Sequence, residues 1–192
     1  MIFAGLDLGQ SIDHAGLVVA EAALRPLAVH VCHVHRYPTG TSYATILPDV
    51  ARELTAFRPP VALSVDSRGP GKPCCDLLSV WPGLRLRRLL AVANTSGRDA
   101  RRQPRRQRDP PFLERWNVPK ITLFRTLTRL VKSGGFTIAD SPQARLLKAE
   151  FSNFGVKLSA AGNLKLESMT GHDDLLLATV ILIWAAVTER AT

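Results

Sequence analysis

The sequence has few of the features that mark secreted or membrane proteins. It contains three cysteines, two of them adjacent at Cys74 and Cys75, and these cannot form a paired disulfide framework. The most hydrophobic helical segment, Leu175–Val187, is about 13 residues long, whereas a membrane span needs about 20. The N-terminus lacks the basic flank and small-residue cleavage site of a signal peptide. We therefore expect a cytoplasmic protein with no membrane partner.

Internal repeats and a nucleotide-binding loop are also missing. No segment fits G-x-x-x-x-G-K-[ST]. Gly69–Pro73 is superficially similar, but its spacing is wrong and Pro73 stands where a metal-binding hydroxyl is required. We therefore expect that this chain is not itself an ATP-driven motor.

Acidic residues are outnumbered by basic ones. The chain has 16 Asp and Glu against 25 Lys and Arg, which gives a net charge of +9 and a pI near 10.2. This excess favours a polyanionic partner, and nucleic acid is the commonest one. A basic surface that serves only solubility is the alternative. With 192 residues, 46% of them hydrophobic, the chain fits a single domain (1–192) that buries a substantial core.

The pattern of apolar residues predicts an α/β fold with a central mixed five-stranded sheet flanked by helices. Short turns between the first three strands favour an antiparallel meander, and parallel strands follow. The uniformly apolar fourth strand is typical of a central strand buried on both faces. The expected strands are residues 2–8, about 14–22, about 27–36, 61–66 and about 86–92. The expected helices are residues 42–57, about 73–81, 119–132, about 142–153 and 175–187. This order of elements is the layout of the ribonuclease-H-like fold.

Residues 94–117 interrupt this pattern. They show no hydrophobic period and contain several prolines, which predicts a loop or a poorly ordered arm. The loop is rich in arginine: Arg98, Arg101, Arg102, Arg105, Arg106 and Arg108. Arginines on a flexible segment neutralise phosphates along a duplex without reading the bases, so this loop is the predicted DNA contact. A solvated loop with no ligand is the alternative.

Acidic residues stand at three separate places that suit metal ligands. Asp7 and Asp66 each end an apolar strand, and Asp173 and Asp174 immediately precede the final helix. If the first and fourth strands are adjacent and parallel, Asp7 and Asp66 lie side by side at one edge of the sheet. The final helix packs on the sheet and brings its N-terminus to the same spot, where the helix dipole favours a carboxylate.

Mutual repulsion decides what must accompany such a cluster. Two unit charges about 4 Å apart repel by about 4 kcal/mol at an effective dielectric constant of about 20. Several converging carboxylates therefore require protons or divalent cations. Oxygen ligands suit Mg²⁺ or Mn²⁺, whereas zinc prefers histidine or cysteine. Taken singly, these aspartates also have ordinary interpretations as turn residues or helix caps.

Together these residues resemble the C-terminal nuclease domain of the large subunit of tailed-phage terminases. The similarity runs in order along nearly the whole chain. Its matching segments are residues 5–11 with Asp13, 33–43, 65–71, 118–120 and 171–175. The sequence Gly171-His172-Asp173-Asp174 combined with Asp66-x-x-Gly-x-Gly71 is fairly specific, whereas Asp7-x-Gly9 alone is weak.

The resemblance implies a metal-dependent endonuclease that cuts double-stranded, concatemeric phage DNA during genome packaging. Two Mg²⁺ or Mn²⁺ ions would activate water and stabilise the leaving oxygen, so no protein nucleophile is required. The catalytic and metal-binding residues carried over by position are Asp7, Asp66, and one or both of Asp173 and Asp174. Lys120 and His172 would contact the DNA phosphate or stabilise charge.

The resemblance also has consequences for partners. Terminase large subunits carry an N-terminal ATPase motor, which this sequence lacks. A motor and a portal would therefore be supplied by other chains. The chain is expected to be an excised domain or a separately encoded nuclease of a phage or prophage, acting in the bacterial cytoplasm.

Three other functions remain open from the sequence. A Holliday-junction resolvase shares the fold and the acidic cluster, and a catalytically silent DNA-binding module shares the basic charge. An actin-like nucleotide-binding domain also opens with a segment like Asp7-x-Gly9, but the chain is short for that fold and has no second phosphate loop.

Histidines at His30, His33 and His35 raise the question of zinc. Successive side chains of a strand point to opposite faces, and no second ligand pair lies at a zinc-site spacing. We therefore expect no zinc site in this segment. Cys74 and Cys75 have no partnering histidine and are expected to be structural.

Overall fold

A computed structural model describes residues 1–9, 13–58, 60–158, 164–168 and 172–190. The motif residues Gln10, Ser11 and Gly171 lie outside these ranges.

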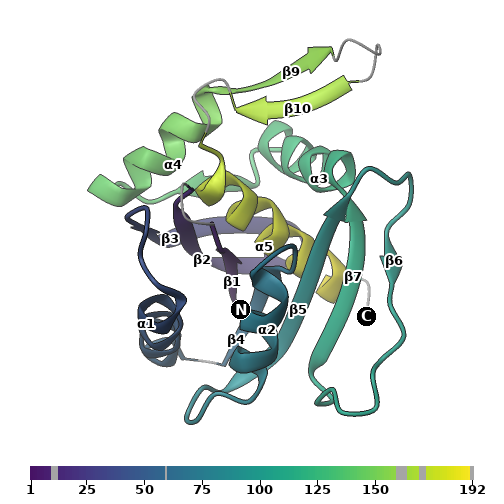
Figure 1. The fold of residues 1–192 in the computed structure, drawn as a ribbon. Coiled ribbons are helices and arrows are strands. Elements are labelled where there is room, and N and C mark those ends of the chain that lie inside the picture. The colour runs from purple at the N-terminus through teal and green to yellow at the C-terminus, as the bar shows by residue number, and fades with distance from the viewer. Residues whose placement is uncertain (10–12, 59, 159–163, 169–171, 191–192) are drawn as a thin grey trace.

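The core of the molecule is a mixed sheet of eight strands (Figure 1). In order across the sheet they are β6 (Arg101–Arg102), β7 (Leu113–Pro119), β5 (Leu86–Thr95), β4 (Val61–Asp66), β1 (Ile2–Asp7), β2 (Ala15–Leu24), β3 (Leu27–Tyr37) and β8 (Phe136–Ile138). Strands β1, β2 and β3 form an antiparallel meander. Strands β4, β5 and β7 extend the sheet parallel to β1. A separate hairpin pairs β9 (Phe154–Leu158) with β10 (Leu164–Ser168).

Helices cover both faces of the sheet. The helices are α1 (Tyr43–Thr55), α2 (Gly71–Ser79), α3 (Lys120–Lys132), α4 (Pro142–Ser152) and α5 (Asp174–Arg190). One hydrophobic core lies under α5, which is flanked by α3 and α4, and a second core lies under α1 and α2. The result is a three-layer α/β/α arrangement.

The alternation of β1 shows why this strand is apolar throughout. Phe3 packs into the core under α5, whereas Ala4 and Leu6 pack into the core under α1. Both faces are covered, so every residue of β1 is buried. Gly5 allows α5 to lie directly on the strand, because a Cβ atom at this position would stand 1.8 Å from the carbonyl oxygen of Ala178. This close contact fixes the helix that carries Asp174.

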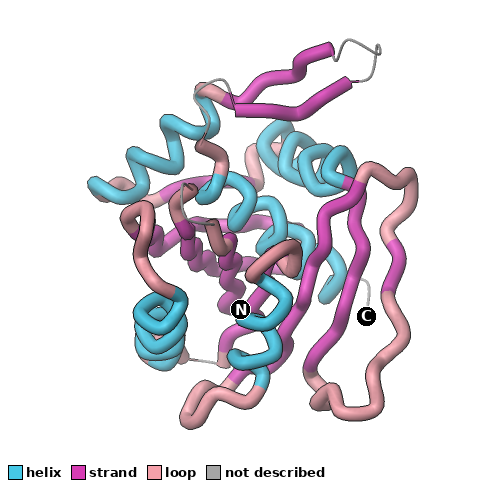
Figure 2. The backbone as a smooth tube through the Cα atoms, in the orientation of Figure 1, coloured by secondary structure: helices cyan, strands magenta, loops and turns pink. Residues whose placement is uncertain are grey.

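The predicted mixed sheet is confirmed, but the predicted number of five strands is wrong. Of the additional strands, β6 and most of β7 lie within residues 94–117, which the sequence indicated to be a loop, and β5 continues to Thr95. Figure 2 shows β6 within the long connection between β5 and β7. Strand β7 is hard to recognise in the sequence because one of its buried positions is an arginine. Arg115 is 6% exposed and donates hydrogen bonds to Asp76 at 2.6 Å and Asp109 at 3.0 Å.

Helix α5 is hydrophobic on all sides, as expected for a helix that is buried by neighbours around it. Within the described ranges, no helix combines the length and the apolar character that crossing a membrane requires.

Candidate metal centre

Two adjacent strands end in aspartates at the same edge of the sheet. The parallel pairing of β1 with β4 sets Leu6 opposite Val65, so Asp7 and Asp66, the next residues, lie side by side. Both are buried, with exposures of 8% and 4%. Asp7 follows the alternation of Phe3, so its side chain is directed to the face that α5 covers.

Helix α5 brings two further aspartates to this edge. Asp174 is the first residue of α5, and the carbonyl of Asp173 accepts the first helical hydrogen bond, from Leu177 at 2.7 Å. Gly16, which pairs with Asp7 across β1 and β2, lies against the backbone of Asp174. The positive end of the helix dipole therefore faces the strand-borne carboxylates.

The four predicted aspartates line one pocket of about 350 Å³. Its other polar side chains are those of Asp13 and Arg68. The structure thus places residues separated by more than a hundred positions in sequence around a single solvent-accessible cavity.

Burial and mutual repulsion disfavour ionisation of this cluster. Burial raises the pKa of the Asp7 carboxyl well above its usual range, and the charges of the neighbouring aspartates raise it further. Burial also raises the pKa of Asp174 to about 6, although the guanidinium of Arg36 acts to lower it. Full ionisation of the pocket therefore needs additional positive charge.

Part of that charge is provided by Arg68, a residue to which the sequence assigned no role. Its backbone N–H donates to Asp66 Oδ1 at 3.0 Å, and its Nη2 donates to Asp66 Oδ2 at 3.1 Å. Asn94, at the end of β5, donates to the same Oδ2 at 3.1 Å. Both oxygens of Asp66 are therefore occupied by donors from the protein. The Arg68 side chain is 53% exposed.

The pocket has the donors that a hard divalent cation requires. Its available ligands are carboxylate oxygens, which suit Mg²⁺ and Mn²⁺. One of them, Asp174 Oδ2, is buried and has no hydrogen-bond partner among the described atoms. Within the described part of the chain, no three of these carboxylates offer oxygens that all lie within 4.8 Å of one another.

The two other predicted phosphate contacts border the acidic cluster. Lys120, the first residue of α3, forms an ion pair with Asp173 at 3.3 Å. His172 is half-buried, and its ring centroid lies 5.0 Å from that of His14. Lys120 therefore balances charge at the pocket, and His172 immediately precedes the aspartate pair.

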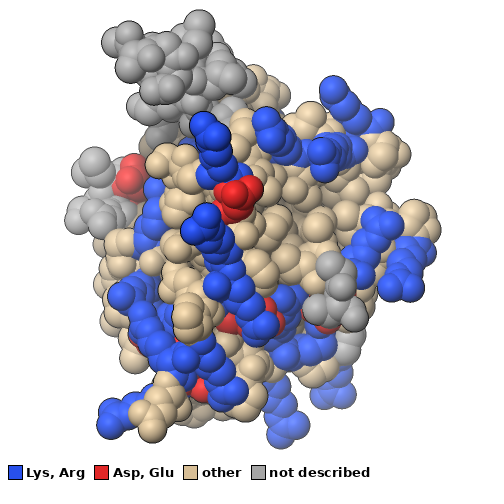
Figure 3. Space-filling model, turned by 90° about the vertical axis from the view of Figure 1, so that its right-hand side faces the viewer, with Lys and Arg blue, Asp and Glu red and all other residues tan. Residues whose placement is uncertain are grey.

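The six arginines of the predicted DNA contact are all exposed. They belong to the segment around β6, at the edge of the sheet. Figure 3 shows Lys and Arg gathered on the side of the molecule that includes this edge. Some of these arginines also make local contacts: Arg102 lies 3.5 Å from Glu114, and Arg105 donates to the carbonyl of Asp109 at 2.8 Å. The exposed guanidinium groups present a basic surface at this edge.

A buried glutamate supports the pocket from α4. Glu150 is 4% exposed and accepts hydrogen bonds from Arg36 at 2.5 Å and from the backbone N–H of Leu176 at 2.9 Å. Sequence analysis missed this residue because it stands among the ordinary polar positions of an amphipathic helix.

The topology and the acidic edge define the class of fold. A three-strand antiparallel meander continued by parallel strands, with aspartates at the ends of the first and fourth strands, is the ribonuclease-H-like fold. The sequence-based prediction of this fold is confirmed.

Within this class, the chain is similar to the nuclease domains of phage large terminases. It aligns with the large terminase nuclease of thermophilic phage G20c with bound magnesium, with a TM-score of 0.67 and 15% identity, covering 96% of this chain and 80% of that one. The nuclease domain of the large terminase of bacteriophage SPP1 with bound manganese gives a TM-score of 0.61 at 15% identity, with coverages of 96% and 85%. The large terminase of bacteriophage HK97 gives 0.60 at 18% identity, and the matched region is 39% of that longer protein.

Neither a sequence-family model nor a curated protein sequence matches the chain. At identities of 15–18%, the structural similarity establishes the fold. The resemblance seen in the sequence is confirmed at that level.

Proposed function

We propose that this protein is a divalent-metal-dependent endonuclease that cuts double-stranded, concatemeric phage DNA during genome packaging. The observation that carries the proposal is the meeting of Asp7, Asp66 and Asp174 in one pocket at the edge of a ribonuclease-H-like sheet. The magnesium and manganese bound to two structurally similar terminase nucleases agree with the oxygen-rich character of this pocket.

We propose that the pocket holds two ions rather than one. Four aspartates line it, and two ions about 3.5–4 Å apart can share such a set of carboxylate ligands. When bound, such a pair supplies Lewis acidity at the attacking and leaving oxygens of the phosphodiester.

The residues of the chain then have distinct tasks. Asp7, Asp66 and Asp174 hold the cations, and Asp173 contributes as a further ligand or through its ion pair with Lys120. His172 immediately precedes Asp173 and Asp174 in the sequence and is proposed to contact phosphate. The exposed arginines around β6 hold the duplex by its backbone, which gives binding with little sequence preference.

Packaging also requires partners. The duplex is the substrate, and an ATPase motor and portal are proposed to be supplied by other chains. The reaction would take place in the cytoplasm of the bacterial host.

Cleavage of supercoiled plasmid in Mn²⁺ or Mg²⁺ tests the proposal. Asp66→Asn should lower the rate by at least about 100-fold while the fold and DNA binding persist. Glu21→Gln is the matched control, because Glu21 is exposed and pairs with Ile2 at the opposite end of β1. Metal-dependent cleavage that survives Asp66→Asn would contradict the assignment.

The choice of substrate separates the alternatives. Linear duplex and a four-way junction of equal length are compared under the same conditions. Preference for the junction would indicate a resolvase, whereas DNA binding without nicking in either metal would indicate a silent binding module.

A further inference from the structure

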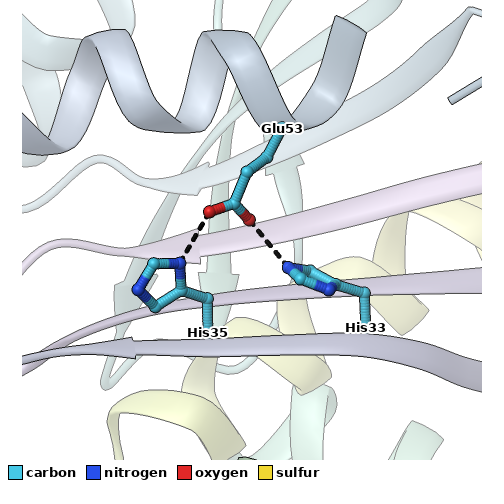
Figure 4. Close-up of side chains that lie close together, drawn as sticks. All are labelled: His33, His35 and Glu53. Atoms are coloured by element: carbon cyan, nitrogen blue, oxygen red, sulfur yellow. Dashed lines mark hydrogen bonds and ion pairs between the residues drawn. The ribbon is translucent and has the colours of Figure 1, made fainter. Parts of the chain in front are cut away.

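Two histidines of β3 and a glutamate of α1 form a compact cluster outside the acidic pocket. His33 Nε2 lies 2.7 Å from Glu53 Oε2, and His35 Nδ1 lies 2.6 Å from Glu53 Oε1. Figure 4 shows both rings directed from the strand toward this one carboxylate. Among the described residues, this is the one trio of His, Cys, Asp or Glu whose ligand atoms all lie within 4.8 Å of one another.

A β-bulge at Cys32 turns the two rings toward α1. In the pairing of β2 with β3, two consecutive residues of β2 face His33 and Val31, so Cys32 is an extra residue of β3. Val31 packs into the core under α5, whereas Tyr37 packs into the core under α1. The extra residue reverses the alternation of the strand, and His33 and His35 therefore share the face of Tyr37.

We propose that His33, His35 and Glu53 form a binding site for one zinc-type transition-metal ion. Imidazole nitrogens with one carboxylate are a typical donor set for Zn²⁺, which Mg²⁺ does not favour. In a tetrahedral site with metal–ligand distances of about 2.0–2.1 Å, ligand atoms lie about 3.3 Å apart. The present nitrogen–oxygen distances of 2.6 and 2.7 Å run to the two different oxygens of Glu53, so each pair has to open by about 0.7 Å and the carboxylate has to turn one oxygen toward both rings to admit the ion.

The surroundings leave the site accessible and one coordination position open. The side chains of His33 and His35 are 39% and 32% exposed, so an ion reaches them from solvent. The nearest additional carboxylate, Asp49, has an oxygen 3.8 Å from His35 Nδ1 but is already engaged by Arg52 and by the hydroxyl of Tyr37. A solvent molecule is therefore the fourth ligand.

The bound ion would fasten α1 to β3. This connection bears on the acidic pocket indirectly, since the hydroxyl of Tyr43 at the start of α1 donates to the carbonyl of Gly9 at 2.7 Å, just beyond Asp7. None of His33, His35 and Glu53 lines the acidic pocket. The zinc site is therefore separate from the acidic pocket, and its test does not require the proposed nuclease activity.

Titration of untagged, metal-stripped protein with ZnCl₂, followed by isothermal calorimetry, tests the site. Wild type should bind one Zn²⁺ at this site with a rise in thermal midpoint. Loss of an outer-sphere partner lowers metal affinity by about 10–100-fold. Because His33 and His35 are direct ligands in this proposal, His33→Asn and His35→Asn should each weaken zinc binding by more than that. Two matched controls should keep it: His30→Asn, since His30 lies on the same strand but bonds Thr137, and Asp66→Asn in the acidic pocket.

Zinc affinity that is unchanged in both histidine variants, or lost in Asp66→Asn alone, would overturn the proposal, as would the absence of saturable binding. X-ray absorption at the zinc edge of the loaded wild type gives a second measurement that does not depend on the folding of a variant. It should report two imidazole ligands, and a spectrum with oxygen ligands only would also overturn the site.

Discussion

Glu150 accepts a hydrogen bond from the backbone N–H of Leu176 at 2.9 Å, and this bond joins α4 to the first turn of the helix that carries Asp174. Amides in the first turn of a helix have no partner within the helix. The second oxygen of Glu150 accepts from Arg36 on β3 at 2.5 Å. One buried carboxylate therefore ties three elements together next to the acidic pocket.

Removal of this carboxylate should loosen the start of α5. Glu150→Ala leaves the buried Leu176 amide without its acceptor and removes one carboxylate partner from Arg36, so we expect a loss of about 1–3 kcal/mol in the free energy of unfolding. Glu150→Gln keeps an oxygen for the amide and should cost less. Urea denaturation measures both. An alanine variant as stable as wild type would show that the bond does not hold the helix.

Asp7→Asn should stabilise the metal-free protein while it abolishes cleavage. Burial and the neighbouring carboxylates raise the pKa of Asp7, and burial raises that of Asp174 to about 6. The folded state thus retains protons that the unfolded chain has released, so stability falls as pH rises from about 4 to about 6. Replacing the Asp7 carboxyl by the uncharged amide of asparagine removes part of this loss of folding stability.

Thermal melts in EDTA at pH 7.5 measure this effect. A gain of about 1 kcal/mol corresponds to about 2–4 °C for a domain of this size. Addition of Mn²⁺ should raise the midpoint of wild type but scarcely that of Asp7→Asn. A variant that melts below wild type in EDTA would mean that repulsion in the pocket is already relieved by other groups. Glu21→Gln serves again as the exposed control.

The fold and the acidic edge were predictable because they depend on simple patterns. The buried strand ending in Asp66 is uniformly apolar, and the aspartates before α5 precede a long hydrophobic segment. A uniformly apolar strand indicates burial on both faces of the sheet. Acidic residues directly before a hydrophobic segment indicate the start of a helix. They fix which carboxylates meet, since parallel strands bring their carboxyl ends to one edge.

The features that escaped prediction depend on pairing between distant residues. Strand β7 has Arg115 at a buried position, which is possible only because Asp76 and Asp109 neutralise it. The bulge at Cys32 depends on the register between β2 and β3, which local sequence does not report. The pairing of Arg68 with Asp66 is likewise seen only in the three-dimensional structure, which shows where the Arg68 side chain lies in the pocket.

Arg68 should compete with the metal for Asp66. Its guanidinium occupies the carboxylate in the metal-free protein, and the pair must open for a cation to bind. Because the arginine is half-exposed, we expect Arg68→Gln to lower the Mn²⁺ concentration for half-saturation by only about two- to fivefold. Calorimetric titration measures this value, with Arg129→Gln, on the exposed side of α3, as control. Unchanged or weaker Mn²⁺ binding would show that Arg68 does not compete.

The exposed arginines around β6 should bind DNA through phosphates alone. The triple variant Arg98→Gln, Arg101→Gln and Arg108→Gln removes three exposed charges that are not needed for the core. Each lost phosphate contact should reduce the slope of log affinity against log salt by about 0.9, so the slope falls by up to about 2.7.

Fluorescence anisotropy with two duplexes of unrelated sequence, over a range of salt concentrations, measures the slope. Affinity for both duplexes should fall equally, because phosphate contacts carry no base information. The control replaces three exposed charges of α3, Arg125, Arg129 and Lys132, and so removes the same net charge. If the control lowers the slope as much as the triple variant does, the net positive charge of the protein explains DNA binding, and the segment around β6 has no special role.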